Sequence, residues 1–208
     1  MLLRVCRPRL QRRCPLSKTD NLYVEEAALR INFANDARWF GDNFSLSDLR
    51  LRCKLSSDGA LIEQIYAASR DAEMRQLDWP AEQKQAFLRS QCALQAAHYA
   101  AHYPGAHFLI VEQGVAAVGR LYWQWQNHPG TDSYALHLIE ITLLPEHRGH
   151  GLAGALIRGL QAQARQVAAC MTLHVDPYIP ALALYQHLGF KPLARQTEGN
   201  LLPMHWKA

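Results

Sequence analysis

The sequence predicts a mixed α/β domain, and three features of its pattern indicate this fold class. A strand, a glycine-containing loop and a helix follow one another directly within residues 138–156. Two apolar strands, 107–112 and 115–125, are separated only by a short Gln-Gly step, which is typical of a hairpin. Helical patterns at 60–70 and 81–103 precede that hairpin. Strands and helices therefore alternate along a single chain.

The first elements follow from simple periodicity. Residues 49–55 alternate apolar and basic side chains, as in a half-exposed strand, and Ser56–Gly59 has turn and cap chemistry. The helix at 60–70 is expected to bury Leu61, Ile65 and Ala68. The longer helix at 81–103 carries one stripe, formed by Leu88, Cys92, Ala96, Tyr99 and Tyr103. We expect the folded domain to begin at this first strand.

The central strand and the helix after it differ in their period. Ile139, Ile141 and Leu143 alternate with their neighbours at the period of a strand, and Pro145 ends the strand because it lacks a backbone donor. Apolar residues then recur every three or four positions at Leu152, Leu156, Leu160, Ala164 and Val167. A strand at 171–175, a helix at 179–188 and strands at 190–196 and 201–206 complete the expected order.

Composition narrows the class of protein. The chain has 208 residues, nearly half of them apolar, which is enough for one full domain with a core. It has no run of about 18 apolar residues, so we expect no membrane span. The five cysteines show no C-x-x-C or Cys/His metal spacing, and their odd number suits a disulfide framework poorly. We therefore expect a cytoplasmic protein without a metal.

Charge is concentrated at the amino-terminal end. The whole chain carries +4, whereas the residues before the first acid, Asp20, carry six positive charges, so the remainder carries −2. Nucleic-acid binding by the main domain is therefore not expected. We predict that residues 1–45 form a basic, non-catalytic extension and that residues 46–208 form the functional domain. Only a nucleic-acid-binding role of the arginine-rich arm would change this interpretation.

The loop at 148–153, Arg-Gly-His-Gly-Leu-Ala, has the chemistry of an anion site. The first N–H groups of a helix have no partner inside the helix and lie at the positive end of its dipole. Glycines in front of such a helix let a ligand approach the bare backbone. The spacing differs from that of a dinucleotide-binding fingerprint or a P-loop. The pattern alone also fits a simple strand-to-helix corner.

Two motifs in sequence order resemble the GNAT superfamily of N-acetyltransferases. Arg148-x-x-Gly151-x-Ala153 is similar to its Arg/Gln-x-x-Gly-x-Gly/Ala signature, and the segment Leu184–Phe190 is similar to a second signature of that superfamily. The resemblance extends over residues 46–207. It implies the acyl-CoA N-acyltransferase fold, with a mixed, mostly antiparallel central sheet of six to seven strands flanked by helices.

The resemblance also implies a co-substrate and a site for it. Acetyl-CoA would donate an acetyl group to an amine acceptor, with backbone groups of Leu143 holding the pantetheine. The diphosphate would bind the backbone amides of the following loop, which are those of Arg148, Gly149, His150, Gly151, Leu152 and Ala153. The resemblance places Tyr185 at the position of the family's acid. A tyrosine suits this role because a phenol stays protonated at pH 7 and can hydrogen-bond a departing sulfur. A tyrosine that simply packs on a helix is the alternative.

The sequence leaves the identity of the general base, which would take the proton of the amine, open among three residues. Glu140 lies among apolar neighbours, where an unpaired carboxylate is costly, and it is the preferred candidate. His137 is the second candidate, and His174 on the next strand is the third. Strict alternation places His137 and Glu140 on opposite faces, so both can face the amine only if a bulge shifts the register. Transfer of the proton through water, or a purely structural Glu140, are the alternatives.

One departure from the family pattern leaves a second function open. Tyr178 and Ile179 stand where the family has an asparagine that contacts the cofactor, although Asp176 could replace part of that contact. A catalytically silent acyl-CoA-binding module is therefore the alternative to an N-acetyltransferase. The aromatic residues that could line an acceptor cleft are Trp79, Tyr99, Tyr103, Tyr122, Trp123 and Trp125. The acceptor could be a small molecule or a protein or peptide amine, and a homodimer is compatible with the sequence.

Overall fold

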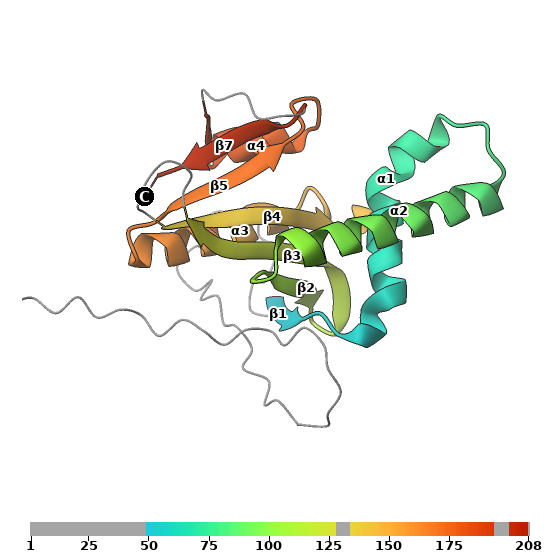
Figure 1. Cartoon of the computed structure of the whole chain (residues 1–208), viewed down its shortest axis with the longest axis horizontal. Helices are drawn as coiled ribbons and strands as arrows, with labels where there is room; N and C mark the ends of the chain where they lie inside the picture. Colours follow the sequence, from blue (N-terminus) through green and yellow to red (C-terminus); the bar gives the residue numbers. More distant parts are fainter. Residues whose placement is uncertain (1–48, 128–133, 194–199, 208) are drawn as a thin grey trace, which may run out of the picture.

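A computed structural model describes residues 49–127, 134–193 and 200–207. These residues form one twisted sheet with helices against both of its faces (Figure 1). The predicted extension, 1–45, lies outside the described residues, as do residues 194–196 of the predicted strand at 190–196. The non-catalytic role of the extension therefore stays a prediction.

The seven strands of the described chain form one sheet in the order β1-β2-β3-β4-β5-β7-β6. Among them, β4 and β5 are parallel, and every other neighbouring pair is antiparallel. This confirms the predicted mixed, mostly antiparallel sheet. The strand bounds are β1 Leu49–Cys53, β2 His107–Gln113, β3 Ala116–Asn127, β4 Tyr134–Leu143, β5 Cys170–Val175, β6 Lys191–Pro192 and β7 Leu202–Trp206.

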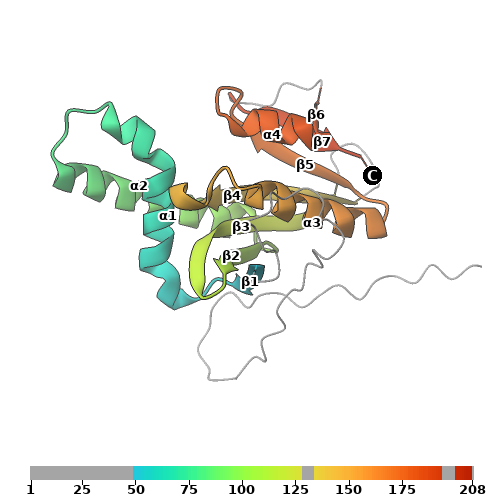
Figure 2. The same ribbon diagram turned by 180° about the vertical axis from the view of Figure 1, so that it is seen from behind.

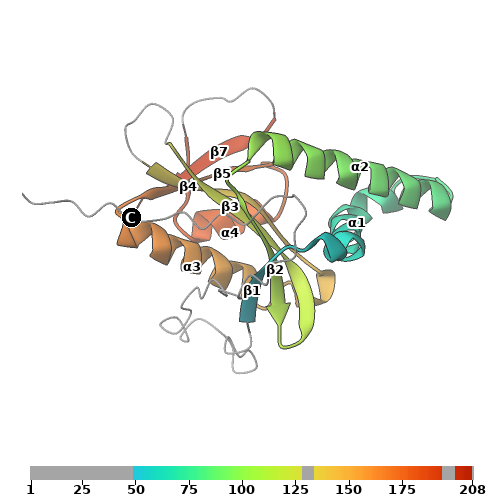
Figure 3. The same cartoon turned by 60° about the horizontal axis from the view of Figure 1, so that its bottom comes forward.

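Two pairs of helices cover the sheet. The helices are α1 Gly59–Arg75, α2 Ala81–His102, α3 Leu152–Gln166 and α4 Ala181–His187. A view from behind shows α3 and α4 in front of the sheet, whereas α2 lies on the far side (Figure 2). Figure 3 shows the same strands running between α2 and α3. Within the described ranges, no helix combines the length and the apolar character that a membrane crossing requires.

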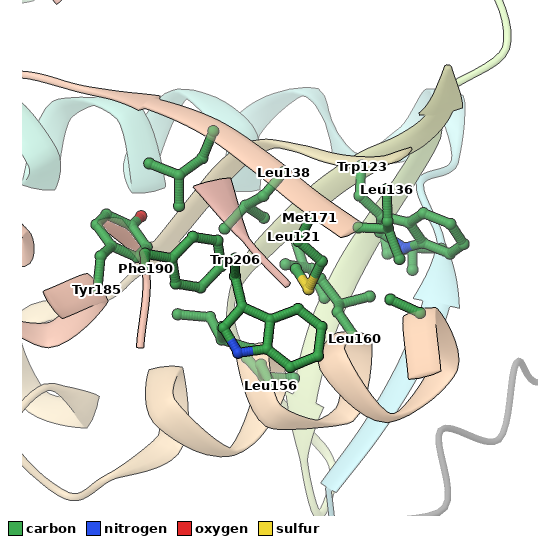
Figure 4. Packing of buried hydrophobic residues seen from close by; sticks show 14 of the residues in the cluster. Leu121, Trp123, Leu136, Leu138, Leu156, Leu160, Met171, Tyr185, Phe190 and Trp206 are labelled. Carbon is green, nitrogen blue, oxygen red and sulfur yellow. The ribbon is translucent and has the colours of Figure 1, made fainter. Parts of the chain in front are cut away.

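The main core lies between the sheet and the α3–α4 face (Figure 4). The predicted stripe of α3 is buried from Leu152 through Ala164, but Val167 is 44% exposed because it lies beyond the last residue of the helix. In Figure 4 the side chains of Leu156 and Leu160 point toward the strands, close to Trp206 of β7. This packing fixes α3, and therefore the loop that begins it, against the middle of the sheet.

Helix α1 differs from the expectation in its buried face and its length. It buries Ile62, Ile65 and Tyr66, whereas Leu61 is only partly buried and Ala68 is not in the core. The helix continues five residues past the predicted end at Arg70, through a last turn that buries Met74 and in which Arg75 pairs with Asp71 at 2.6 Å. Ion pairs four residues apart stabilise a helical turn, and together with the burial of Met74 this explains why the helix extends beyond the predicted stripe.

Helix α2 is more exposed than its apolar stripe predicted. Cys92 is its one buried residue, and Ala96 is exposed. Much of the helix extends beyond the edge of the sheet (Figure 1), and its carboxyl-terminal half lines a cavity together with residues of β2 and β3. That half carries Tyr99, which with Tyr103 at the end of the helix covers the central strands.

Candidate functional site

The loop between β4 and α3 presents free backbone donors at the start of a helix. Gly149 and Gly151 adopt φ values of +78° and +80°, a region that L side chains rarely occupy. The first hydrogen bond of α3 is donated by Ala155 to the carbonyl of Gly151, at 3.0 Å. The N–H groups of Leu152, Ala153 and Gly154 therefore have no acceptor within the helix. They form the positive end of α3, where an anion is stabilised.

Arg148 anchors the loop to neighbouring elements, and its backbone amide is already hydrogen-bonded, so it is not free for a ligand. Its N–H donates to the carbonyl of Pro145 at 3.1 Å, inside a short 3-10 turn. Its Nε donates to the carbonyl of Leu143 at 2.8 Å, and Nη2 donates to the carbonyl of Ala68 at 3.3 Å. The side chain thus connects the end of β4, the loop and α1. The other predicted loop amides follow directly after this anchored residue.

Strands β4 and β5 separate near the loop. They pair from Ala135 with Cys170 to Leu138 with Leu173. Beyond this point β4 continues to Leu143 and β5 to Val175, and the two strands diverge (Figure 1). The edge of β4 that faced β5 is then no longer paired with it, so its backbone groups can hydrogen-bond an extended ligand. Leu143, which we expect to hold the pantetheine, lies at the end of this edge.

A bulge in β4 brings His137 and Glu140 to one face. Glu140 is opposite Tyr122 of β3, and Leu138 is opposite Trp123, so Ile139 is the additional residue. His137 stacks on Tyr103, with 6.0 Å between the ring centroids, and Tyr103 contacts Tyr99. Tyr99 in turn lies beside the Glu140 carboxylate, and burial, followed by this negative charge, raises the pKa of Tyr99. Both candidate bases therefore face α2, which strict alternation excluded.

The two oxygens of Glu140 have different surroundings. Oε1 accepts hydrogen bonds from Arg120 Nε and from Thr142 Oγ1, each at 2.8 Å, and forms an ion pair with Arg120 Nη2. Oε2 is buried and accepts no hydrogen bond from the part of the chain that the structure describes. Glu140 therefore has a charged partner and still keeps one oxygen available.

His137 is a buried, neutral imidazole. It is 4% exposed, and its Nδ1 lies 2.9 Å from the hydroxyl oxygen of Thr172. Burial, and to a smaller extent His174 at 5.5 Å between the rings, lowers the pKa of His137 to about 4. Burial also lowers the pKa of His174. Both rings are therefore weaker bases than an ordinary histidine.

Tyr185 lies on α4, across the sheet from α2. It is 8% exposed and contacts the Phe190 ring edge to face, with 5.8 Å between the centroids. In Figure 4 its hydroxyl points away from Leu156 and Trp206. Burial, and then the negative charge of Glu140, raise the pKa of Tyr185 to about 12. The phenol is therefore protonated at neutral pH, and it is close enough to Glu140 to sense that charge.

Sequence reasoning missed the partners of these residues. Arg120, Gln95 and Thr142 form the hydrogen-bonded group around Glu140, and Thr172 contacts His137. The available signal was Arg120 itself, a basic residue between Gly119 and Leu121 in the middle of an apolar strand. A buried charge of that kind requires a partner.

The predicted aromatic cluster divides between two faces. Tyr99, Tyr103 and Tyr122 lie together on the α2 face, near Glu140. Trp123 and Trp125 contact each other and pack in the main core on the opposite face. A cavity opens between α2 and strands β2 and β3. Its walls include Lys54, Cys92, Gln95, Tyr99, Phe108, Arg120 and Tyr122.

The segment that departs from the family pattern forms an exposed turn. Tyr178 is 91% exposed, and Ile179 is also largely exposed. Asp176 Oδ1 accepts a hydrogen bond from the Tyr178 amide at 2.9 Å, so this oxygen caps its own turn. The carboxylate is thus already engaged within the turn that precedes α4.

Comparisons with known proteins agree with this architecture. The model of the Acetyltransferase (GNAT) family matches residues 68–190. A comparison with curated protein sequences gave no match. The solved structures with a similar fold include PaiA N-acetyltransferase from Thermoplasma acidophilum in complex with coenzyme A, at 16% identity and a TM-score of 0.53. That alignment covers 77% of this chain and 99% of the other.

Two further solved structures have a comparable likeness. A GCN5-related N-acetyltransferase from Rhodopseudomonas palustris is 22% identical, with a TM-score of 0.54, and the alignment covers 79% of this chain and 99% of the other. A histone acetyltransferase HPA2 and related acetyltransferase from Corynebacterium glutamicum is 19% identical, with a TM-score of 0.51 and coverage of 74% and 93%. At these identities the likeness establishes the shared fold. The family model covers more than half of the residues, and the chain therefore belongs to the GNAT acetyltransferase family.

Proposed function

We propose that the protein transfers the acetyl group of acetyl-CoA to a primary amine. The observation that carries this proposal is the combination of a glycine loop with free amides, a diverging pair of strands, and a carboxylate and a phenol near the point of divergence. In a GNAT acetyltransferase each of these features would contribute to binding acetyl-CoA or to catalysis. Acetyl-CoA supplies the activated thioester, and the chain supplies orientation and proton transfer.

The loop and the strand edge would bind the donor. The amides of Gly149, His150, Gly151, Leu152 and Ala153 would hold the diphosphate, with Arg148 fixing the loop to β4. Backbone groups near Leu143 would align the pantetheine along the unpaired edge of β4. The acetyl group would then lie where β4 and β5 separate, between Glu140 and Tyr185.

Glu140 would act on the acceptor. Its Oε2 can take a proton from the amine, directly or through a water, as the nitrogen forms a bond to the acetyl carbon. The carbon–sulfur bond breaks, and coenzyme A leaves as its thiolate or thiol. His137 is a weaker candidate because burial lowers its pKa to about 4. It would shape the wall of the site together with Tyr103.

Tyr185 would stabilise the departing sulfur. The phenol pKa of about 12 is roughly three units above that of an ordinary thiol, so donating a hydrogen bond is favoured over complete proton transfer. Once Glu140 has accepted a proton its negative charge is lost, and this cause of the raised Tyr185 pKa disappears. The phenol therefore becomes a better donor after the amine has been deprotonated.

The acceptor would approach on the α2 face. Tyr99 and Tyr122 are close to Glu140 there, and they also line the cavity beneath α2. Aromatic side chains can hold the carbon skeleton of an amine and interact favourably with its positive charge before deprotonation. Both small molecules and protein or peptide amines remain candidates for this acceptor. A cytoplasmic location stays a prediction from the sequence.

A silent acyl-CoA-binding module is the second candidate, favoured by Tyr178 and Ile179 at the family's asparagine position. Tyr185→Phe separates the two functions. Acetyl-CoA affinity would be measured by calorimetry, and thiol release would be followed with a panel of alkylamines, polyamines and peptides. An enzyme should retain its affinity and lose about a hundredfold or more in rate. A module would bind acetyl-CoA equally in both forms and release no thiol with any acceptor.

A further inference from the structure

The Glu140 carboxylate is held from one side only. Three donor groups converge on Oε1, namely Nε and Nη2 of Arg120 and the hydroxyl of Thr142. Oε2 is buried and accepts no hydrogen bond of ordinary geometry from the described residues, although the Tyr99 phenol interacts with the same carboxylate. A carboxylate that served only to pair with a guanidinium would be expected to use both oxygens, because the fork of Arg matches them in a bidentate arrangement. The observed arrangement leaves one oxygen for another donor.

Arg120 is itself fixed on two sides. It is 2% exposed, and its Nη2 donates to Gln95 Oε1 of α2 at 2.9 Å. Its guanidinium also lies 5.4 Å from the centre of the Tyr122 ring. Although burial alone would lower the pKa of Arg120, the Glu140 carboxylate and neighbouring phenols raise it, so the guanidinium stays charged. It therefore provides a fixed positive charge at the inner side of Glu140.

The other titratable groups around Glu140 cannot replace this charge. Tyr99 on α2, Tyr122 on β3 and Tyr185 on α4 are phenols that stay neutral at physiological pH. His137, on the same face of β4, is also neutral there. Within the described residues, Arg120 is the one cation paired with Glu140. Without it, a buried carboxylate would be expected to take up a proton.

A purely stabilising role explains this arrangement poorly. Two charges removed from water gain little net stability from their attraction, and apolar residues of similar volume often serve as well. A buried ion pair does impose a geometry, because each partner is strongly penalised when it is left alone. The geometry imposed here directs the open oxygen of Glu140 away from the guanidinium.

We propose that Arg120 is a positioning residue that, supported by Gln95 and Thr142, keeps Glu140 charged and leaves Oε2 as the oxygen that receives the acceptor's proton. This inference rests on the proposed function. In this role Arg120 exchanges no proton itself, although it also lines the cavity on the α2 face. It acts through Glu140 alone, which gives the inference a specific experimental signature.

The first test needs no acceptor. The infrared carbonyl band of a protonated carboxylic acid would be recorded at pH 7 for the full chain, for Arg120→Met, and for Arg120→Met combined with Glu140→Gln. We expect the band to appear in Arg120→Met and to be absent from both wild type and the double variant. If Arg120→Met shows no band that depends on Glu140, the inference is wrong. Should Arg120→Met fail to fold, Arg120→Gln would be used, which also removes the positive charge but keeps a polar side chain that can hydrogen-bond its neighbours.

The second test measures rates with the best amine of the panel. Arg120→Met should lower kcat by about tenfold or more without changing the affinity for acetyl-CoA. In the Glu140→Gln background the same substitution should change kcat less than twofold, because the residue through which Arg120 acts is already neutral. Equal losses in both backgrounds would show that Arg120 acts independently of Glu140.

Arg52→Met is the matched control for these rates. Arg52 also pairs with two carboxylates, Asp58 at 2.7 Å and Glu112 at 2.6 Å, but it lies at the β1 edge of the sheet. Its loss should lower stability and leave kcat unchanged. A wild-type chain that binds acetyl-CoA and acetylates no amine would count against the proposed function, and the infrared test would then decide the role of Arg120 on its own.

Discussion

His137 and Glu140 share one face of β4 although an odd number of positions separates them. Ile139 is the extra residue of a bulge, which turns Glu140 to the same side as His137, opposite Tyr122. The bulge also lies next to the point at which β4 leaves β5. The bulge therefore lies both where β4 and β5 diverge and where polar side chains come together. This coincidence is consistent with a functional role for the bulge.

The buried imidazole of His137 should make stability depend on pH. The folded pKa of His137 is about 4, whereas an unfolded histidine has a pKa near 6.5, so between these values the unfolded chain binds more protons. The free energy of unfolding should therefore fall as the pH drops from about 6.5 to about 4. The contribution of this residue is about 3 kcal/mol.

Chemical denaturation between pH 7 and pH 4 would measure this effect for wild type and for His137→Gln, whose amide can still reach Thr172. The variant should lose clearly less stability over that range. His102→Gln, an exposed histidine of α2, is the control and should follow wild type. Identical pH profiles for wild type and His137→Gln would contradict the buried, neutral state of His137.

The glycine at position 151 should be required for binding of the donor. Gly151 has φ of +80°, so Gly151→Ala introduces backbone strain of about 1 kcal/mol and places a methyl group beside the loop amides. We expect the affinity for acetyl-CoA, measured by calorimetry, to fall about tenfold or more.

Gly114→Ala provides the control for that strain. Gly114 has φ of +62° in the turn between β2 and β3, far from the loop in sequence and on a different element. It should lose similar stability and keep its affinity for acetyl-CoA. An equal loss of affinity in both variants would indicate that the effect is general destabilisation.

Gly119 should be required for the close approach of β3 and β4. A Cβ atom at this position would collide with the Thr142 carbonyl oxygen and lie 2.7 Å from Leu143 Cδ2 and 3.0 Å from Leu143 Cα. Gly119→Ala should destabilise the chain by about 2 kcal/mol and weaken acetyl-CoA binding, because it displaces the strand edge at Leu143.

Thermal unfolding and calorimetry would test Gly119→Ala against Gly105→Ala, where an added Cβ meets nothing within 4 Å. The Gly105 variant should match wild type in both measurements. Unchanged stability of Gly119→Ala would mean that the contact between β3 and β4 is less tight than the structure indicates.

Periodicity predicted much of the fold, because the elements around the core have one strongly apolar side. The buried stripe of α3 and the hairpin of β2 and β3 are examples. Periodicity failed where the buried residues of a strand do not follow strict alternation. Strict alternation grouped Leu138 with Glu140, but the bulge at Ile139 places Leu138 in the main core instead. A bulge depends on contacts with the neighbouring strand, which the local sequence does not report.

The sequence predicted individual residues of the candidate site but not the contacts between them. The glycines at 149 and 151 adopt the positive φ values that make such a loop. The pairing of Arg120 with Glu140, and its link to Gln95, join residues from three elements far apart in the sequence. Such contacts arise from tertiary packing, so no spacing rule could predict them.

The binding of a diphosphate by the start of α3 is the central claim, and the glycine amides report on it directly. With the chain labelled with ¹⁵N at glycine, CoA would be added and each amide resonance followed by NMR. The account predicts the largest shifts at Gly149, Gly151 and Gly154, and small shifts at Gly105 and Gly114. If CoA leaves the resonances of Gly149, Gly151 and Gly154 unchanged, the proposed donor site is contradicted.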